Sequence, residues 1–389
     1  MTTAIPSDLD EPIELRDDGV YAVSSYELTA ALLRDQRLRP ATTGVIDRLN
    51  PEWRRRRSLR MLADMILLDV PPRHGAVRAA IHERFSVSAV TGMRDRIDTL
   101  AEGLIDAADE GGRPIDFAAR IARALPLAVI GEIIGIDQAD RPRIARRTKT
   151  IMDTMWYAVD EFIRADAAAI QLDRYFHDKI RRSRAGESET DLITALADTV
   201  GLSDDEIVAN LVFLVMAATF TTGDFLGSAL VRSCREPELR RRLRDRSEVE
   251  DAIEEALRLD PPVARVVRNT AVDVDAAGTT IPAGSLIEFD LRAANRDPRQ
   301  FDEPDRYRAD RRAGRALSFG YGAHYCAGWA LGKAEAVSVL PAFWRRFPDS
   351  RLAAEPEPEP HPFLNGFGRI LVDTGRGETP NRPPNPPSS

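Results

Sequence analysis

The sequence predicts a mainly helical protein with small β-sheets that folds as one domain over residues 1–375. Most of the first half places apolar residues at three- and four-residue spacing, which is the helical period. One segment that begins after Gly201 has no proline until Pro237, which allows a very long helix. Short alternating segments bounded by glycine and proline follow in the last third of the chain. The polar, proline-rich residues 376–389 are expected to be a disordered tail.

The helical period covers four segments of the first half: residues 76–110, 115–135, 150–183 and 189–198. A helix is expected to begin at Pro71-Pro72, because proline is tolerated in the first helical turn. In the second half, another helix is predicted over residues 246–259, directly before Pro261-Pro262.

A long helix is predicted to begin at Ser203. Ser203 and Glu206 have the spacing of a capping box, in which each residue satisfies a backbone N–H of the other. About 30 residues of helix would extend roughly 45 Å at 1.5 Å per residue. The centre of the segment, LVFLVMAATF, is apolar on every side, so we expect this helix to be buried within the domain.

Two hairpins are predicted after the helices. In the first, residues 272–276 and 285–289 are short strands separated by glycine and proline turn signals. In the second, the dipeptide Asn365-Gly366 joins residues 363–364 to residues 367–372, and this dipeptide strongly favours a two-residue hairpin turn.

Composition argues against several classes of protein. The 389 residues carry a formal net charge of -8, whereas a dedicated nucleic-acid-binding protein has a basic excess. No stretch approaches twenty consecutive apolar residues, and the acidic N-terminus lacks the apolar core of a signal peptide. We therefore expect a cytoplasmic protein without a membrane span. The two cysteines, Cys234 and Cys326, are too few and too far apart for a disulfide framework or a zinc site.

The most specific chemistry lies in SFGYGAHYCAGWALGKAE, residues 318–335, of which residues 318–328 are called the cysteine loop below. The loop carries the pattern F-G-x-G-x-H-x-C-x-G, formed by Phe319, Gly320, Gly322, His324, Cys326 and Gly328. Glycines let the backbone fold tightly beneath a flat cofactor, and N–H groups at a helix start stabilise a thiolate. Such a thiolate is a ligand for iron, and Phe319 can shield it from water. A buried structural cysteine is the alternative interpretation.

This pattern resembles the haem-binding loop of the cytochrome P450 family in its bacterial, soluble form. The resemblance extends over residues 15–373. It implies a cytochrome P450 fold in which the long central helix and the cysteine loop sandwich haem b. It also implies that the thiolate of Cys326 is the axial iron ligand, which favours O–O bond cleavage. Phe319 and Gly328 would then help to bind the cofactor.

A second motif of the family, E-x-x-R, matches Glu255 and Arg258. Because the two residues are three apart on the predicted helix, their side chains share a face and can pair. The same resemblance makes Arg306, in the segment Pro304-Asp305-Arg306-Tyr307, the third member of the set. Glu255 would then be held between two guanidiniums, and the expected role of all three residues is structural.

The two propionates of haem need cationic partners when they are partly buried. In the family, these partners correspond here to His74 and Arg78, to Arg268 on the first strand, and to His324 of the cysteine loop. Arg265 competes with Arg268 for the strand position. For His74 and Arg78, a pair of solvent-exposed charges is the alternative.

The long helix departs from the family pattern in the segment that faces oxygen. Ala218 replaces the usual glycine, Phe220 replaces the usual acid, and Thr221 matches the usual threonine. The acid and the alcohol normally deliver protons through water, and a phenyl ring cannot relay a proton. Three explanations would compensate for the missing acid. The substrate itself organises water, the reaction needs fewer protons, or Asp224, one helical turn further along, serves instead. Alternatively, Phe220 only shapes the pocket and ordinary hydroxylation continues.

The resemblance also implies a set of apolar pocket residues: Met216, Ala217, Phe220, Val263, Val266, Val267, Phe363 and Leu364. The roof of the pocket is expected near Met152, Met155, Trp156 and Tyr157, although an aromatic stripe at helical spacing more often belongs to the core. Residues 54–57, together with Arg60, form a basic run that either grips an acidic substrate or is a solvated face.

These features predict a haem-thiolate monooxygenase that acts on a small apolar or natural-product-like substrate by hydroxylation, epoxidation or oxidative coupling. The chain has no flavin or nicotinamide motif, so we expect a separate ferredoxin and ferredoxin reductase to supply electrons. The ferredoxin would dock on the cysteine side, near Lys333. We expect a monomer that binds neither nucleic acid nor membrane. A catalytically silent haem-binding scaffold, for recruitment or sensing, is the alternative.

Overall fold

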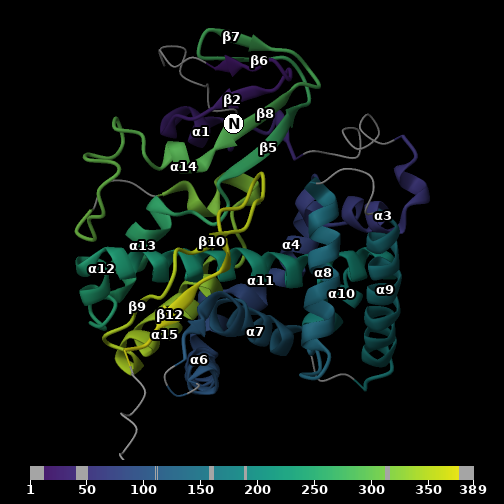
Figure 1. Cartoon of the computed structure of the whole chain (residues 1–389). Coiled ribbons are helices and arrows are strands. Elements are labelled where there is room, and N and C mark those ends of the chain that lie inside the picture. Colours follow the sequence, from purple (N-terminus) through teal and green to yellow (C-terminus); the bar gives the residue numbers. More distant parts are fainter. Residues whose placement is uncertain are drawn as a thin grey trace, which may run out of the picture.

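One long helix runs through the middle of the molecule, other helices pack around it, and the largest sheet lies at one end (Figure 1). The computed structural model describes residues 13–375 apart from residues 41–50, 110, 112, 157–161, 188–190 and 312–315. The described part is mostly helical with small sheets in one domain, which confirms the predicted fold class. The tail expected over residues 376–389 lies outside the described residues.

The central helix is α11 (Asp204–Arg235). The helices before it are α1 (Tyr26–Leu32), α3 (Arg57–Ala63), α4 (Arg73–Phe85), α5 (Val87–Gly92), α6 (Arg94–Ala108), α7 (Ala124–Ile134), α8 (Arg141–Trp156), α9 (Phe162–Arg184) and α10 (Asp191–Ala197). The helices after it are α12 (Pro237–Arg242), α13 (Val249–Leu259), α14 (Leu291–Ala294) and α15 (Trp329–Arg346). A helix does begin directly after Pro71-Pro72, as predicted.

Two of the predicted helical segments are interrupted. Residues 76–110 form three helices, because Ser86 caps α5 by accepting a hydrogen bond from the N–H of Ala89, and α6 begins only after Met93. Residues 115–135 begin with strand β4 (Ile115–Asp116) and a π-helical turn before α7 starts. Apolar periodicity alone does not detect such breaks, since the buried face continues across them.

Helix α11 begins as the sequence predicts. The N–H of Ser203 donates to the carboxylate of Glu206 at 2.7 Å, and the N–H of Glu206 donates to the hydroxyl of Ser203 at 3.3 Å. By length and composition alone α11 would also be long and apolar enough to cross a membrane, but 67% of its apolar window is buried inside the protein. It packs against α7, α8 and α9 and forms the centre of the helical core.

The largest sheet has the strand order β1-β2-β8-β5-β3. Its strands are β1 (Glu14–Leu15), β2 (Tyr21–Val23), β8 (Leu286–Asp290), β5 (Arg265–Thr270) and β3 (Leu38–Arg39). Smaller sheets consist of β6 (Val274–Ala276) with β7 (Thr279–Ile281), of β10 (Glu357–Pro358) with β11 (Phe367–Arg369), and of β4, β12 (Leu371–Asp373) and β9 (Arg351–Leu352).

Both predicted hairpins were wrong in their pairing. Strand β6 pairs with β7 across Gly278, and β8 pairs with β5, where Val267 lies opposite Glu288. Leu364 forms an isolated bridge with Val263, and β11 pairs with β10, so Asn365-Gly366 is not the turn of a hairpin. For β6, the nearer turn at Ala277-Gly278 decided the pairing, whereas Leu364 found its partner about a hundred residues away at Val263.

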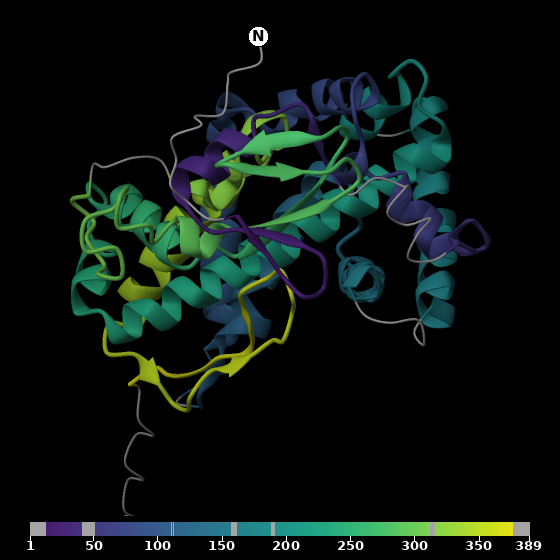
Figure 2. The ribbon, with the colours of Figure 1, turned by 90° about the horizontal axis from the view of Figure 1, so that it is seen from above.

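The basic run that precedes and begins α3 is tied to α9. The guanidinium of Arg57 bonds both carboxylate oxygens of Asp173, at 2.5 and 2.6 Å. Asp166 accepts hydrogen bonds from the N–H and hydroxyl of Ser58 at 2.9 and 2.8 Å, and also pairs with Arg56. Seen from above, α3 lies against α9 at one side of the molecule (Figure 2). Arg56 and Arg57 therefore link these helices through ion pairs, while the side chain of Arg56 remains 41% exposed.

Candidate active site

The cysteine loop has the tight backbone that its glycines predict. Gly320 and Gly322 have φ values of 69° and 74°, in the left-handed region that favours glycine. A Cβ on Gly322 would lie 2.4 Å from the carbonyl oxygen of Leu33, so no larger residue fits there. The N–H of Cys326 donates to the carbonyl oxygen of Phe319 at 3.0 Å and closes the loop.

Cys326 lies just before the start of α15. Burial raises the pKa of its thiol, whereas the N–H of Gly328 and the guanidinium of Arg78 lower it. Arg78 also donates a hydrogen bond of 2.7 Å to the carbonyl oxygen of Tyr325, the neighbour of Cys326. The groups that stabilise a thiolate are thus in place beside the sulfur.

A buried side chain that the sequence did not single out holds the start of the cysteine loop. Asn295 accepts a hydrogen bond of 2.7 Å from the N–H of Leu317 and donates one of 3.0 Å to the hydroxyl of Ser318. That hydroxyl donates to the carbonyl oxygen of Leu257 on α13 at 2.8 Å. Arg258 donates to the carbonyl oxygen of Asn295 at 2.7 Å, which joins the E-x-x-R pair to the loop. A lone asparagine after a short helix carries no sequence signal for this role.

Glu255 is held between two guanidiniums, but the second belongs to Arg311, so the prediction for Arg306 was wrong. Arg258 bonds the two carboxylate oxygens of Glu255 at 2.7 and 2.8 Å, and Arg311 bonds one of them at 3.1 Å. The side chain of Arg306 is 69% exposed and pairs with Glu303. The turn directs this side chain outward, while the carbonyl oxygen of Arg306 faces the cluster and accepts from Arg311 at 3.2 Å.

His74, Arg78, Arg268 and His324 lie together, although they come from α4, β5 and the cysteine loop. The ring centroids of His74 and His324 are 4.2 Å apart. Burial, together with the charges of Arg268, His74 and Arg78, lowers the pKa of His324 to about 3. Burial also lowers the pKa of Arg268 to about 10. Burial and the neighbouring arginines therefore keep the two histidines neutral, while the guanidiniums carry the positive charge of the cluster.

No carboxylate of the described residues lies within ion-pair distance of Arg78 or Arg268. Arg265, in contrast, has its Nε 3.7 Å from Glu288 and 3.5 Å from Asp290, so Arg268 is the arginine of β5 that faces the cluster. Partly buried cations without carboxylates are suited to binding an anion. The two propionates of a haem that lies on the cysteine loop meet this requirement, so the residues present fit this cofactor.

Across from the cysteine loop, one face of α11 is partly exposed and consists of Ala217, Ala218, Thr221 and Thr222. The hydroxyl of Thr221 donates to the carbonyl oxygen of Ala217 at 2.7 Å, while the side chain of Phe220 is buried. A Cβ on Gly332 of α15 would lie 3.4 Å from Oγ1 of Thr222. The helix that follows Cys326 therefore passes close to the part of α11 where the sequence predicted the oxygen side of the site.

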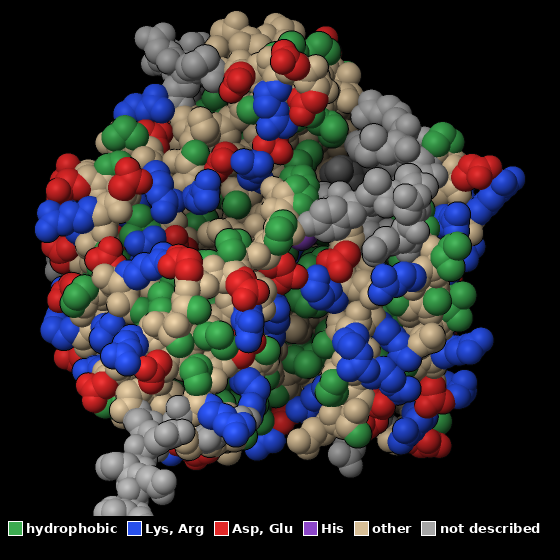
Figure 3. Space-filling view, in the orientation of Figure 1, with side chains coloured by type: hydrophobic (Ala, Val, Ile, Leu, Met, Phe, Trp, Pro, Cys, Tyr) green, Lys and Arg blue, Asp and Glu red, His purple; other side chains and the backbone are tan. Residues whose placement is uncertain are grey.

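The apolar residues predicted for the pocket lie on neighbouring elements. Met216 and Ala217 are on α11, Val266 and Val267 are on β5, and Val263 is bridged to Leu364, which follows Phe363. Hydrophobic side chains line a hollow near the centre of the face that Figure 3 shows. Met152 on α8 is half-buried; the side chains of Met155 and Trp156, and all of Tyr157, lie outside the described residues.

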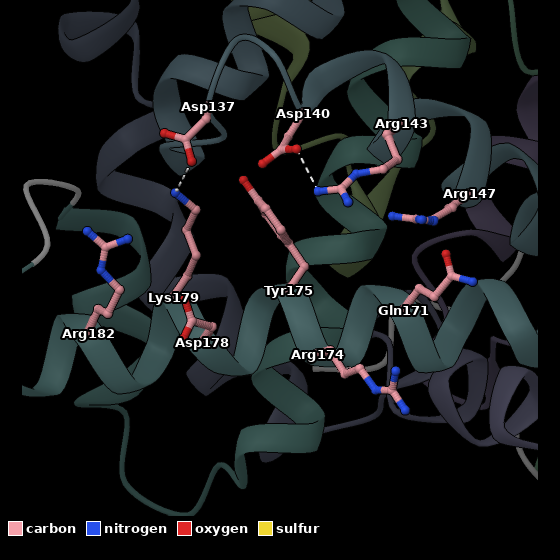
Figure 4. A pocket seen from close by; sticks show the side chains of 10 residues that line it. All are labelled: Asp137, Asp140, Arg143, Arg147, Gln171, Arg174, Tyr175, Asp178, Lys179 and Arg182. Carbon is pink, nitrogen blue, oxygen red and sulfur yellow. Dashed lines mark hydrogen bonds and ion pairs between the residues drawn. The ribbon is translucent and has the colours of Figure 1, made fainter.

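A charged groove between α8 and α9 is separate from this site (Figure 4). It is lined by Asp137, Asp140, Arg143, Arg147, Gln171, Arg174, Tyr175, Asp178, Lys179 and Arg182. Two of its cations pair with carboxylates of the groove itself, Lys179 with Asp137 at 3.2 Å and Arg143 with Asp140 at 2.5 Å. None of the residues predicted for cofactor or substrate binding lines the groove.

The site combines three features of a haem-thiolate protein. Its cysteine lies beside the N–H groups of a helix start, its cations have no carboxylate partners among the described residues, and a helix that carries a threonine lies opposite. A family model described as Cytochrome P450 matches residues 136–372. The chain belongs to the cytochrome P450 family. It is a haem-thiolate monooxygenase, and the thiolate of Cys326 is the axial ligand of the haem iron.

Relatives and solved structures agree with this assignment. The putative cytochrome P450 140 of Mycobacterium bovis is 31% identical over 93% of this chain and 86% of its own length. Cytochrome P450 107B1 of Saccharopolyspora erythraea is 32% identical over 74% of this chain and 71% of its own. The myxobacterial cytochrome P450 CYP267B1, solved with myristic acid, superposes with a TM-score of 0.82 at 30% identity and covers 91% of this chain and 89% of its own.

Proposed function

We propose that this cytochrome P450 oxidises a small apolar or natural-product-like molecule, and that its proton supply departs from the family pattern. The observation that carries the proposal is Phe220, a buried side chain that cannot exchange a proton, at the position of the usual acid beside Thr221. The altered supply consists of a polar group of the substrate, of an oxidant such as peroxide that needs fewer protons, or of another acid of the chain such as Asp224. The apolar lining from α11 and β5 suits a substrate with little charge.

In this proposal each part of the site has one task. Haem supplies the oxidising chemistry when it is bound. His74, Arg78, Arg268 and His324 hold its propionates, and Phe319 and Gly328 shape the sulfur side. Ala218 leaves room beside the ring, and the hydroxyl of Thr221 anchors water or a polar group of the substrate. The apolar residues of the pocket exclude water from the reacting carbon. They are Met216, Ala217, Val263, Val266, Val267, Phe363 and Leu364.

The comparisons support an apolar substrate without naming one. The structure of CYP267B1 contains myristic acid. Another structure with 27% identity and a TM-score of 0.80 is described as the enzyme CxnD for C–S bond formation in chuangxinmycin biosynthesis. Because CxnD is described by a bond-forming reaction, oxidative coupling stays within the proposal beside hydroxylation and epoxidation.

We further propose that a separate ferredoxin and its reductase supply electrons to a monomeric, cytoplasmic enzyme. An acidic ferredoxin would meet basic side chains on the cysteine side of the molecule. Lys333 on α15 is one such residue, although its ammonium group already pairs with Glu254 and lies 5.2 Å from the ring centroid of Trp329. To bind a carboxylate of ferredoxin, Lys333 would therefore have to exchange Glu254 for it.

The test is a screen of apolar ligands against the haem-loaded protein by optical spectra, followed by turnover with ferredoxin or peroxide. A true substrate displaces water from the iron and changes its spin state. If the substrate assists proton delivery, the Phe220→Glu variant should consume more oxygen than the wild type without forming more product. A sharp rise in product would mean that the absence of the acid only slows ordinary catalysis, and the proposal of an altered proton supply would be wrong. Ligand binding without any turnover would favour the silent scaffold instead.

A further inference from the structure

A chain of charged side chains connects the surface of α8 to the middle of α11. Lys149 bonds Asp153 at 2.9 Å and Glu359 at 3.0 Å. Glu359, which lies between β10 and β11, also pairs with Arg123, and Arg123 lies 3.8 Å from Asp224. The exposed fraction of these side chains falls from 37% at Lys149 through 29% at Glu359 and 24% at Arg123 to 9% at Asp224. The chain therefore runs from solvent to the interior.

The position of Arg123 depends on two unusual features of the backbone. A π-helical turn, Ala118–Ala122, precedes Arg123, and such turns are frequent at functional sites. On α11, a Cβ at Gly223 would lie 3.0 Å from Cγ of Arg123, so the glycine allows the arginine to cross the helix closely. Arg123 also donates to the carbonyl oxygen of Phe367 at 3.0 Å. Its guanidinium is thus fixed between α11 and the segment that follows β10.

Asp224 lies one helical turn beyond Thr221, the residue on the oxygen side of the site. It follows Thr221 by three residues on α11, which puts the two Cβ atoms about 5–6 Å apart on one face of the helix. One water molecule can bridge two polar groups at that separation. Gly366 covers the carboxyl group so closely that a Cβ there would lie 2.2 Å from Oδ1 of Asp224. The carboxyl group is therefore confined beside α11.

The surroundings of Asp224 keep a proton on it near neutral pH. Burial raises its pKa to about 7; the charge of Arg123 opposes this shift, Glu359 supports it and Lys149 opposes it. A proton donor is most effective when its pKa lies near the working pH. An ordinary, exposed aspartic acid would have lost its proton several pH units lower.

We propose that Asp224 takes the place of the acid that Phe220 has replaced and delivers protons to the oxygen side of the site through Thr221. One proton leaves the carboxyl group of Asp224, and one returns to it from solvent through Glu359 and intervening water. Arg123 and Lys149 do not release protons; they hold the two carboxyl groups and the water between them in line. This inference rests on the proposed atypical proton supply and names its source.

The experiment compares four variants of the haem-loaded enzyme. Asp224→Asn removes the proton donor, and Gly366→Ala displaces the carboxyl group without removing it. Glu359→Gln interrupts the path to solvent. Glu357→Gln is the matched control, because Glu357 lies two residues away, is 65% exposed and pairs only with Arg369 among the described residues.

The first measurement is an infrared titration, which does not depend on turnover. We expect a carboxyl band in the wild-type protein that titrates near pH 7, is lost in Asp224→Asn and is shifted in Gly366→Ala. The second measurement is product formed per oxygen consumed. Loss of a positioned acid typically costs about 10²–10⁴-fold in rate; we expect at least a tenfold loss of coupling in Asp224→Asn and Gly366→Ala, a smaller loss in Glu359→Gln, and none in Glu357→Gln.

Three outcomes would overturn the proposal. The absence of a band near neutral pH would show that Asp224 does not hold a proton there. Unchanged coupling in Asp224→Asn, with an intact spectrum of the reduced carbon monoxide complex, would show that another group donates. An equal loss in the Glu357→Gln control would attribute the effect to general disruption. If no substrate is turned over by any variant, the proposed function fails, but the infrared result still decides whether Asp224 carries the proton.

Discussion

Arg311 lies with its Nε 3.1 Å from Oε1 of Glu255, in a cluster where both side chains are almost completely buried. The carboxylate also receives two hydrogen bonds from Arg258 and one from the N–H of Arg308 at 3.0 Å. Since Arg258 in turn bonds Asn295, the position of the cysteine loop depends on this cluster.

Substitution of Arg311 is expected to destabilise the protein far more than substitution of Arg306. Removal of one partner from a buried ion pair typically costs about 3–5 kcal/mol, because the remaining charge loses its compensation. Arg306→Ala, at a side chain that is 69% exposed, should stay within about 0.5 kcal/mol of the wild type. Urea denaturation of both variants measures the difference. Equal losses of stability would contradict the assignment of Arg311.

Substitution of Arg268 is expected to weaken haem binding, whereas Arg265→Gln should leave it unchanged. A hydrogen bond to a charged group contributes about 1.5–3 kcal/mol, so Arg268→Gln should speed haem loss by roughly 10- to 100-fold. Arg265 is the matched control, because it lies on the same strand and already pairs with Glu288 and Asp290. Transfer of haem to an apoprotein acceptor measures the rate. Faster loss from Arg265→Gln would mean that the two arginines have the opposite roles.

Substitution of Asn295 is expected to misplace the cysteine loop. Asn295→Ala leaves the N–H of Leu317 without its acceptor in a buried site, and an unsatisfied buried group costs about 1–3 kcal/mol. Ser318→Ala keeps that hydrogen bond and should have a smaller effect. The spectrum of the reduced carbon monoxide complex reports how much of the haem keeps its thiolate ligand. A thiolate fraction in Asn295→Ala as high as in the wild type would exclude the positioning role.

The stability of the protein should depend on pH through Asp224. Its pKa is about 7 in the folded protein and has a reference value of 3.8. Between these pH values the folded protein binds one more proton than the unfolded chain, so the free energy of unfolding falls as the pH rises and levels off above about pH 7. Asp224→Asn removes this contribution and should be more stable than the wild type at pH 8, by a difference that shrinks towards pH 5. Parallel curves of stability against pH would show that Asp224 does not titrate there.

The sequence determined those features whose partners are close in the chain. The bends of the cysteine loop, the capped start of α11 and the pairing of Glu255 with Arg258 all follow from glycine conformation or helical spacing, which act over a few residues. The family resemblance added His74, Arg78 and His324, which the structure brings together.

Tertiary structure decided the choice between residues that are equivalent by local pattern. Arg306 and Arg311 are five residues apart, and only the path of the turn determines which side chain reaches Glu255. The same holds for Arg265 and Arg268 on β5 and for the partners of β6 and β8. The charged chain that ends at Asp224 joins four segments that have no pattern in common. Such contacts depend on the direction of side chains in the packed domain, which spacing along the chain does not encode.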